Sequence, residues 1–327
     1  MSFKISMTML GSLIGAGFAT GKEIVNFFGI YGKFAPYLIV VAGLLFFISL
    51  CCFFIAGKYT ENRAILYFFN PLIFIAEFIL LSAMISAMFS ISNIFLSNST
   101  IAYILIILCF IISIFDVNGL TTINTILSPL LILSIITVST LSIKNNYNPV
   151  CLSSESNYIR LILYPFLYFG LNLFTSFPLC RELGKNMTKK EIYLTSFIIS
   201  ITLIATITLI AISIFHSSIK IYNSDMPLAI LAFNINKTFG FIFFFVIIAG
   251  IITTLLSCLY VLNSYHKKFR IKKLQFSMII ILLAYLFNFI GFSGIISLFY
   301  PLIGIFGVAL YVFTEINNKR HKFLLSK

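Results

Sequence analysis

The sequence predicts an all-α integral membrane protein with ten transmembrane helices, on the basis of its composition, its apolar runs and the distribution of its charges. Hydrophobic residues make up 60% of the 327 positions and charged residues only 9%, whereas an ordinary soluble domain carries about 25% charged residues. Apolar runs of about 18 residues or more, the length that crosses a bilayer as a helix, recur along the chain. We therefore treat residues 1–327 as a single membrane domain.

Ten spans follow from the apolar runs and from the polar segments that separate them. Their approximate limits are 4–29, 34–57, 67–96, 99–116, 119–143, 158–182, 192–215, 238–264, 274–292 and 294–316. Between the seventh and eighth spans, Ser224 and Asp225 offer N-cap oxygens and Pro227 suits a first helical turn. We expect a short helix there, exterior or re-entrant, because it cannot cross a bilayer about 30 Å thick.

The positions of Lys and Arg predict the orientation of the chain. If the N-terminus is cytoplasmic, sixteen of them fall on the cytoplasmic side: Lys4, Lys58, Arg63, Arg181, Lys185, Lys189, Lys190, Lys267, Lys268, Arg270, Lys272, Lys273, Lys319, Arg320, Lys322 and Lys327. Six fall outside: Lys22, Lys33, Lys144, Arg160, Lys220 and Lys237. The strongly basic loops thus share one face, as the positive-inside rule requires. We expect both termini in the cytoplasm, 317–327 as a basic cytoplasmic tail, and no nucleic-acid partner for the net charge of +13.

Ten spans divide into a first half, about 1–143, and a second half, about 158–316. An odd number of spans in each half gives the halves opposite orientations, which is the arrangement of inverted-repeat transporters. The first span contains the glycine-rich stretch "GSLIGAGFATGKEI" (11–24). The sixth span carries a corresponding set of helix-breaking and polar residues: Pro165, Gly170, Asn172 and Pro178. We expect the first helix of each half to be discontinuous.

Unwinding of the first span at Ile14–Phe18 would free backbone polar groups near the membrane centre. Such groups are tolerated at that depth only where they line a cavity or bind a ligand. A half-helix beginning near Ala19 would point its positive N-terminal end at that cavity, which suits a carboxylate. The first span therefore predicts a binding site.

Close helix packing is the alternative explanation of the same glycines. Two small-xxx-small patterns occur here: Gly11-x3-Gly15 and Gly17-x3-Gly21. Lys22 and Glu23 follow at once and would lie at the exterior mouth of the site. They form either a gate pair or a solvated helix end.

Glu77 is the only carboxylate that we expect well inside a span. Ionisable residues within the membrane are expensive and indicate function by default. Glu77 would pair with a substrate ammonium group, carry a coupling proton, or form structural hydrogen bonds in its protonated form. Asn172, near the middle of the sixth span, would coordinate substrate or bridge two helices.

The eighth span contains "AGIITTLLS" (249–257), in which Thr253 and Thr254 place adjacent hydroxyls beside Gly250. Hydroxyl and carbonyl oxygens suit hard cations such as Na⁺. Alternatively, threonines within membranes often donate to backbone carbonyls of their own helix.

Together these features resemble the LeuT-fold transporters of the amino acid–polyamine–organocation superfamily. More closely, "IGAGFATGKEIVNFFGIYG" (14–32) is similar to the opening of the YkvI-like bacterial membrane proteins, which share a "GAGFxxGxE" start. The resemblance covers the chain in span count, repeat and topology, whereas the motif match is confined to the first span. It implies a LeuT-type 5+5 inverted repeat with broken helices 1 and 6, in a bacterial cytoplasmic membrane.

The resemblance also implies site residues. A sodium ion between the first and eighth spans would be bound by Gly11, Ile14, Gly250, Thr253 and Thr254. The substrate would be held by the backbone of Gly15, Ala16, Gly17, Phe18 and Ala19, together with Phe169 and Gly170, and Glu77 fits an acidic third-span position of some proton-coupled relatives. The residues themselves add Asn172 to this substrate site. A second sodium site of the fold is not expected, because Phe18 stands where that site has an asparagine.

We expect a secondary transporter of a small organic solute, in the first place an amino acid or related amine, that works by alternating access and is driven by Na⁺, H⁺ or both. The alternative on the same fold is a nutrient sensor that does not transport, similar to spore-germination receptor subunits. An enzyme is not expected, because the three histidines (216, 266, 321) lie at span ends or loops and no paired intramembrane carboxylates are predicted. Apart from Na⁺ as a coupling ion no cofactor is expected, and no oligomeric state follows from the sequence.

Overall fold

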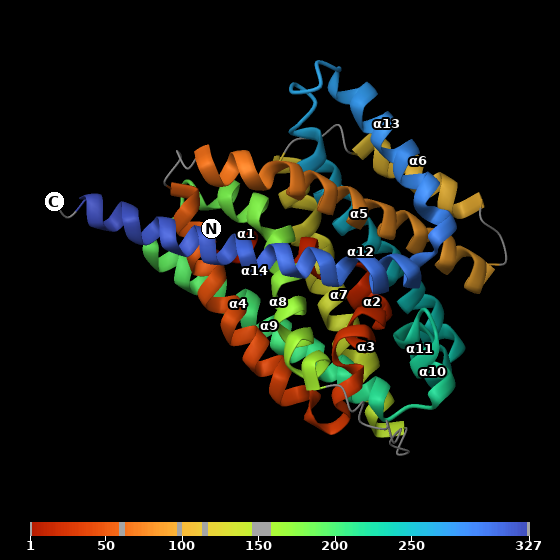
Figure 1. Ribbon diagram of the computed structural model, residues 1–327. Coiled ribbons are helices and arrows are strands. Elements are labelled where there is room, and N and C mark those ends of the chain that lie inside the picture. The colour runs from red at the N-terminus through yellow and green to blue at the C-terminus, as the bar shows by residue number, and fades with distance from the viewer. Residues whose placement is uncertain (1, 59–62, 97–99, 113–116, 146–157, 326–327) are drawn as a thin grey trace.

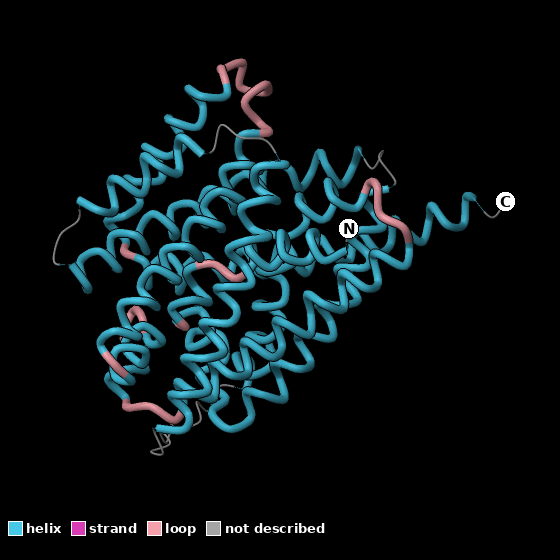
Figure 2. Tube along the Cα trace, turned by 180° about the vertical axis from the view of Figure 1, so that it is seen from behind, coloured by secondary structure: helices cyan, strands magenta, loops and turns pink. Residues whose placement is uncertain are grey.

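The computed structural model describes residues 2–58, 63–96, 100–112, 117–145 and 158–325, and over these residues the chain forms helices and no strand (Figures 1 and 2). The helices up to residue 145 are α1 (Ser2–Leu13), α2 (Ala16–Thr20), α3 (Lys22–Phe28), η1 (Gly29–Phe34), α4 (Ala35–Lys58), α5 (Arg63–Leu96), α6 (Thr100–Ile112) and α7 (Val117–Asn145). Those that follow are α8 (Tyr158–Gly184), α9 (Lys189–Phe215), α10 (Ile219–Asn223), α11 (Pro227–Ile235), α12 (Lys237–Asn263), α13 (Lys273–Leu286), η2 (Phe287–Ile290) and α14 (Phe292–Leu325).

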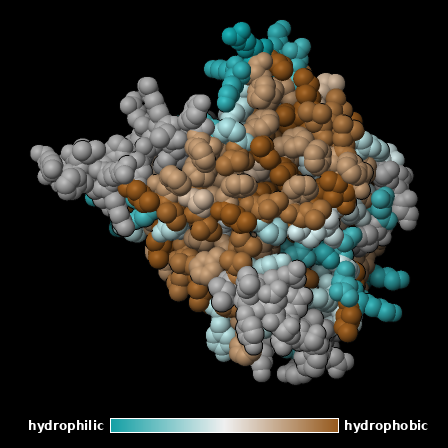
Figure 3. All heavy atoms as spheres, in the orientation of Figure 1, coloured by the Kyte–Doolittle hydropathy of each residue, from teal (hydrophilic) through white to brown (hydrophobic). Residues whose placement is uncertain are grey.

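Seven of the described helices are long and apolar enough to cross a membrane: α4, α5, α7, α9, α12, α13 with η2, and α14. Large apolar side chains are exposed along these helices, among them Tyr37 and Phe289. The face drawn in Figure 3 is broadly apolar, with hydrophilic side chains gathered toward its edges. Apolar patches of this extent are not found on soluble monomers. The chain is therefore a multi-pass membrane protein.

The other three expected spans correspond to α1–α3, α6 and α8. The first is interrupted, and α6 has 13 residues, which span only about 20 Å at 1.5 Å per residue. α8 has 27 residues, enough to cross a bilayer, but its prolines, tyrosines and polar side chains make it less apolar than the seven helices above.

The interruption of the first span lies where the glycines predicted it, but it is narrower. Helical hydrogen bonding stops where the Ile14 amide donates to Leu10 O (2.7 Å) and resumes where the Ala19 amide donates to Gly15 O (2.9 Å). Only Ile14 and Gly15 lie between the helices α1 and α2. The expected unwinding over Ile14–Phe18 is corrected accordingly, and the second piece begins at Ala16, not near Ala19.

A second interruption follows at Gly21. Its φ of 80° and ψ of −4° are left-handed, a conformation that glycine adopts without steric cost. A methyl group there would also press on the side chain of Ile214 in α9. The first span thus consists of three helical pieces, α1, α2 and α3.

The expected break in the sixth span is not present, because α8 is one continuous helix that includes Pro165 and Pro178. Gly170 serves packing instead. A methyl group at Gly170 would overlap the carbonyl oxygen of Gly304 in α14, and one at Gly307 would overlap that of Gly170. Small residues at such a crossing let two helix backbones approach closely, and α8 and α14 form an extensive contact.

The three pieces of the first span lie inside the bundle. α1 packs against α7, α8, α9 and α12, while α2 packs against α11 and α12. α6 and α13 lie side by side at one edge, next to α5 (Figures 1 and 2). The short helix expected after Ser224 is present as α11, although its N-cap is Met226 and no side chain caps it. The expected tail is helical through Leu325, because α14 continues into it.

We expect Gly170→Ala to destabilise the protein, because the added methyl group would force α8 and α14 apart. Overpacking of this kind costs about 1–3 kcal/mol, measurable as a lower midpoint of thermal unfolding in detergent. Gly294→Ala is the matched control, since a methyl group there meets only the side chain of Ile290. Equal midpoints for the two variants would contradict the packing role of Gly170.

Candidate functional site

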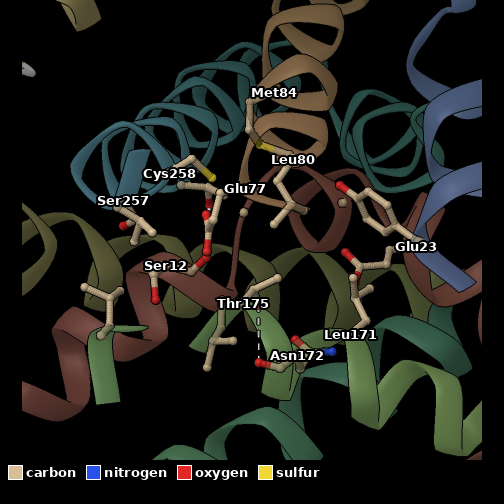
Figure 4. A pocket seen from close by; sticks show the side chains of 17 residues that line it. Ser12, Glu23, Glu77, Leu80, Met84, Leu171, Asn172, Thr175, Ser257 and Cys258 are labelled. Carbon is tan, nitrogen blue, oxygen red and sulfur yellow. Dashed lines mark hydrogen bonds between the residues drawn. The ribbon is translucent and has the colours of Figure 1, made fainter. Parts of the chain in front are cut away.

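A small cavity lies beside the break in the first span, where α1, α2 and α3 face α5, α8, α12 and α14 (Figure 4). Its volume is about 40 Å³, which is room for roughly one to three water molecules. Its walls combine apolar side chains with carboxylates, hydroxyls and an amide. The backbone of the break thus lines a polar space, which is the condition under which irregular backbone is tolerated inside a membrane.

Glu77 enters this cavity from α5 and is only 3% exposed. Figure 4 shows its carboxyl group between Ser12 of α1 and Cys258 of α12. The Cys258 thiol lies in hydrogen-bonding contact with this carboxyl group. A thiol is a weak donor, so the contact offsets only a small part of the cost of burying an ionised carboxylate.

Glu23 lines the same cavity from α3, whereas the sequence placed it at an exterior mouth. It is 7% exposed, and its carboxylate lies directly against Gly17, where a methyl group would overlap Oε2. Tyr168 and Tyr300 are its electrostatic neighbours. Among the described residues no hydrogen bond or ion pair reaches this carboxylate.

The cavity therefore holds two carboxylates, although the sequence analysis expected Glu77 alone within the spans. None of the 17 described residues that line it is Lys, Arg or His. The residue that could have indicated the buried position of Glu23 is Gly21, which directly precedes Lys22 and Glu23. Had Gly21 been interpreted as a second hinge, Glu23 would have been expected on a separate helix that can turn back toward Gly17.

Lys22 points away from the cavity and does not pair with Glu23. Its Nζ donates to the backbone carbonyls of Asn223 (3.3 Å) and Ser224 (3.0 Å), at the end of α10. Asp225 follows in the chain, attracts the Lys22 charge and accepts a hydrogen bond from Ser293 of α14. These contacts join α3, the α10–α11 connection and α14.

The five residues expected around a sodium ion are only partly brought together. Thr254 Oγ1 lies 3.5 Å from the Ser12 carbonyl oxygen, and its side chain also contacts Gly15. The Ile14 carbonyl oxygen lies 3.8 Å from the position that a Cβ atom would occupy if Gly250 carried a side chain. Ile14, Gly250 and Thr254 thus meet where α1 ends against α12.

The other two expected sodium ligands have different neighbours. Thr253 Oγ1 donates to Gly250 O of its own helix at 2.9 Å, which is the alternative considered for membrane threonines. Gly11 faces α7, where a methyl group would overlap Ser128 and press on Asn124. Ser128 and Asn124 donate to the carbonyls of Met7 (2.9 Å) and Thr8 (3.1 Å).

The residues expected to cradle a substrate also divide into two groups. Gly15, Gly17, Glu77 and Asn172 line the cavity. The Asn172 amide donates to Tyr168 O at 2.9 Å, so among the described residues this hydrogen bond lies within α8 and does not connect two helices.

The remaining cradle residues face elsewhere. Ala16 begins α2, and Ala19 packs toward Gly250. The ring of Phe169 faces Tyr311 at 6.2 Å and lines a separate, mainly apolar hollow between α4, α8 and α9. Gly170 lies in the α8–α14 contact described above.

An aromatic cluster, Phe18, Phe27, Phe28 and Tyr168, fills the space around α2 and α3. The Tyr168 ring lies 5.0 Å from Phe28, 5.3 Å from Phe27 and 6.3 Å from Phe18. All four side chains are buried. The cluster packs α3 against α8.

A larger hollow of about 240 Å³ lies toward the C-terminal end of α8. Arg181, Glu182 and Lys185 contribute charged groups to it, and Tyr265 donates to Asn70 O at 3.1 Å within its wall. Val261 lines both this hollow and the cavity. A thin layer of side chains thus separates the two spaces.

No protein-family model matches the chain. A curated protein that it resembles is "Uncharacterized membrane protein YkvI" of Bacillus subtilis (strain 168), 26% identical over 324 residues, which covers 94% of this chain and 93% of that protein. Together with the seven apolar helices, this similarity over nearly the full length supports a helical, multi-pass membrane protein.

Proposed function

We propose that this chain is an ion-coupled secondary transporter of a small organic solute, an amino acid or related amine, that works by alternating access. In this proposal the ten segments span a bacterial cytoplasmic membrane as a LeuT-type 5+5 inverted repeat, with both termini in the cytoplasm. The observation that carries it is the interrupted first helix, whose break lines a buried cavity containing two carboxylates. Solute sites of secondary transporters are built at such discontinuous helices near the bilayer midplane.

The different closure of the two sides of the cavity supports alternating access. On one side Lys22 holds α3 to the end of α10, and the aromatic cluster packs α3 against α8. Toward the 240 Å³ hollow, the layer that contains Val261 is the separation. In this proposal the N-terminus is cytoplasmic, so the hollow faces the cytoplasm and the cavity is closed toward the outside.

The cavity must enlarge to accept a solute, because about 40 Å³ holds only a few water molecules. Closure around a solute and opening to one side at a time are the movements that alternating access requires. The hinge residues Gly15 and Gly21 are placed to permit such movements of α2 and α3.

Two places in the structure support coupling sites. Thr254 Oγ1 lies near the Ser12 carbonyl oxygen, and the Ile14 carbonyl oxygen lies near Gly250, one turn away on α12. Oxygen ligands of this kind suit Na⁺. Glu77 is a carboxyl group buried at the cavity, and such groups carry coupling protons in pumps and transporters.

Reconstitution in liposomes tests the proposal directly. We expect a solute to accumulate against its gradient when an inward Na⁺ or H⁺ gradient is imposed, with amines and amino acids as labelled probes. Binding without any flux would contradict transport and favour the nutrient sensor on the same fold. The absence of both binding and flux would contradict transporter and sensor alike.

Thr254→Ala is expected to lower the apparent Na⁺ affinity of uptake about tenfold, because one ligand oxygen is removed and each factor of ten corresponds to about 1.4 kcal/mol. Thr253→Ala is the matched control, since the Thr253 hydroxyl is engaged within its own helix. Uptake would be measured over a series of Na⁺ concentrations. Unchanged Na⁺ dependence in Thr254→Ala would remove the proposed ion site.

Glu77→Gln is expected to abolish the response of uptake to an imposed H⁺ gradient, because the amide cannot take up and release the coupling proton. The control is Glu191→Gln at the start of α9, where glutamine also forms the capping box with Thr188. Counterflow, which needs no net driving force, shows whether solute binding survives. A fully active Glu77→Gln variant that still responds to H⁺ would assign Glu77 a structural role.

Lys22→Met is expected to loosen the closure near α10, because it removes the hydrogen bonds to the carbonyls of Asn223 and Ser224. Cys258, which lines the cavity, reports on access once the other cysteines are replaced by serine. We expect an impermeant thiol reagent applied from the outside to label Cys258 several-fold faster in Lys22→Met. The control is Lys220→Met on α10, and equal labelling rates in both variants would contradict this role of Lys22.

A further inference from the structure

The charge inside the cavity is one-sided. Glu23 and Glu77 are both more than nine-tenths buried and both line it. None of the described lining residues carries a positive charge. Buried carboxylates need a proton or a cationic partner, and the described wall supplies no cation. A bound cation would complete the site.

Glu23 also occupies the position that a carboxylate from solution would take. The break lies at Ile14 and Gly15, and the Glu23 carboxylate already lies against Gly17 in the first turn of α2. α2 has only five residues, too few to offer a strong positive end. A solute carboxylate would therefore have to displace Glu23 or lie beside it, as a third negative group in a small space of low dielectric constant, where like charges repel strongly.

The rest of the wall suits an organic cation better than a bare metal ion. Leu80 lies between the two carboxylates in Figure 4, with Met84 close by, and Leu171 lies next to Glu23. Tyr300 adds an aromatic ring to the wall. Apolar side chains accommodate methylene groups, and an aromatic face attracts an ammonium group by the cation–π interaction.

We propose that Glu23 is a specificity-determining residue that excludes carboxylate-bearing solutes from the break in the first helix. Together with Glu77 it makes the cavity selective for a compact organic cation that carries an ammonium group and no carboxylate. This inference depends on the proposed function in one respect, because it takes the bound cation to be the solute that the protein transports.

Matched ligands test the proposal on the purified full chain in detergent, by the ligand-induced rise in the unfolding midpoint. The first series is ethylammonium, alanine and propionate, which share a short carbon chain and differ in their charged groups. The second pair is 1,4-diaminobutane and ornithine, which differ by one carboxylate. At about 10 mM, well above a millimolar Kd, we expect the two amines to raise the midpoint by several degrees. Alanine, ornithine and propionate are expected to leave it unchanged.

Variants connect the effect to Glu23. Glu23→Gln is expected to weaken ethylammonium binding at least tenfold and to allow alanine to bind, while Glu23→Asp keeps the charge and the preference for amines. Glu191→Gln, at the start of α9 and outside the cavity lining, is the control and is expected to behave as the wild type, since glutamine also forms the capping box with Thr188. If Glu23→Gln does not fold, the wild-type ligand series and Glu23→Asp still decide the question.

Three results would overturn the proposal. The first is stabilisation of the wild type by alanine or propionate that equals or exceeds that by ethylammonium. The second is stabilisation by Na⁺ or K⁺ alone to which no amine adds, and the third is no stabilisation by any amine of the set. Uptake of alanine by wild-type liposomes would support transport and reject this inference. Ethylammonium binding without uptake would contradict transport and support this inference.

Discussion

The structure depends on one constraint: backbone polar groups released by the break at Ile14–Gly15 must be accommodated inside the membrane. The chain meets it by placing oxygen-bearing side chains against the break from both directions. Thr254 of α12 lies against Gly15, and the Glu23 carboxylate lies against Gly17. Neither glycine has room for a side chain. The arrangement of α5, α8, α12 and α14 around this point follows, because irregular backbone is stable at such depth only within a shell of protein.

The helical class, the position of the first break and the short helix α11 could be predicted from composition, glycine spacing and an N1 proline. The break expected in the sixth span could not be judged in the same way. Glycine permits unwinding and close packing equally, and the partner of Gly170 lies more than a hundred residues away in α14. Local sequence does not reveal that Gly304 and Gly307 complete a helix crossing there. Only tertiary contacts distinguish a glycine that permits unwinding from one that permits close packing.

The candidate site shows the same division between local and tertiary information. Glu77 was evident because a carboxylate in a long apolar run is rare. Glu23 was placed at the surface because the turn at Gly21, which aims it inward, is set by a backbone angle of 80° and not by a hydrophobic pattern. Likewise, the two neighbouring hydroxyls of Thr253 and Thr254 differ in role because only one of them faces the end of α1. Residue type indicated which chemistry is present, while helix rotation decided which atoms meet.

Lys22 and Glu23 are the first two residues of α3, but their side chains contact different parts of the protein. Lys22 holds carbonyls at the end of α10, and Glu23 holds its place beside Gly17 in the cavity. Both are carried by α3, which is attached to α2 through the single left-handed residue Gly21. Rotation of α3 about Gly21 moves both side chains at once. In the proposed transporter, the occupancy of the cavity and the outer closure are therefore linked through one rigid turn of helix, with no need for a longer path through the protein.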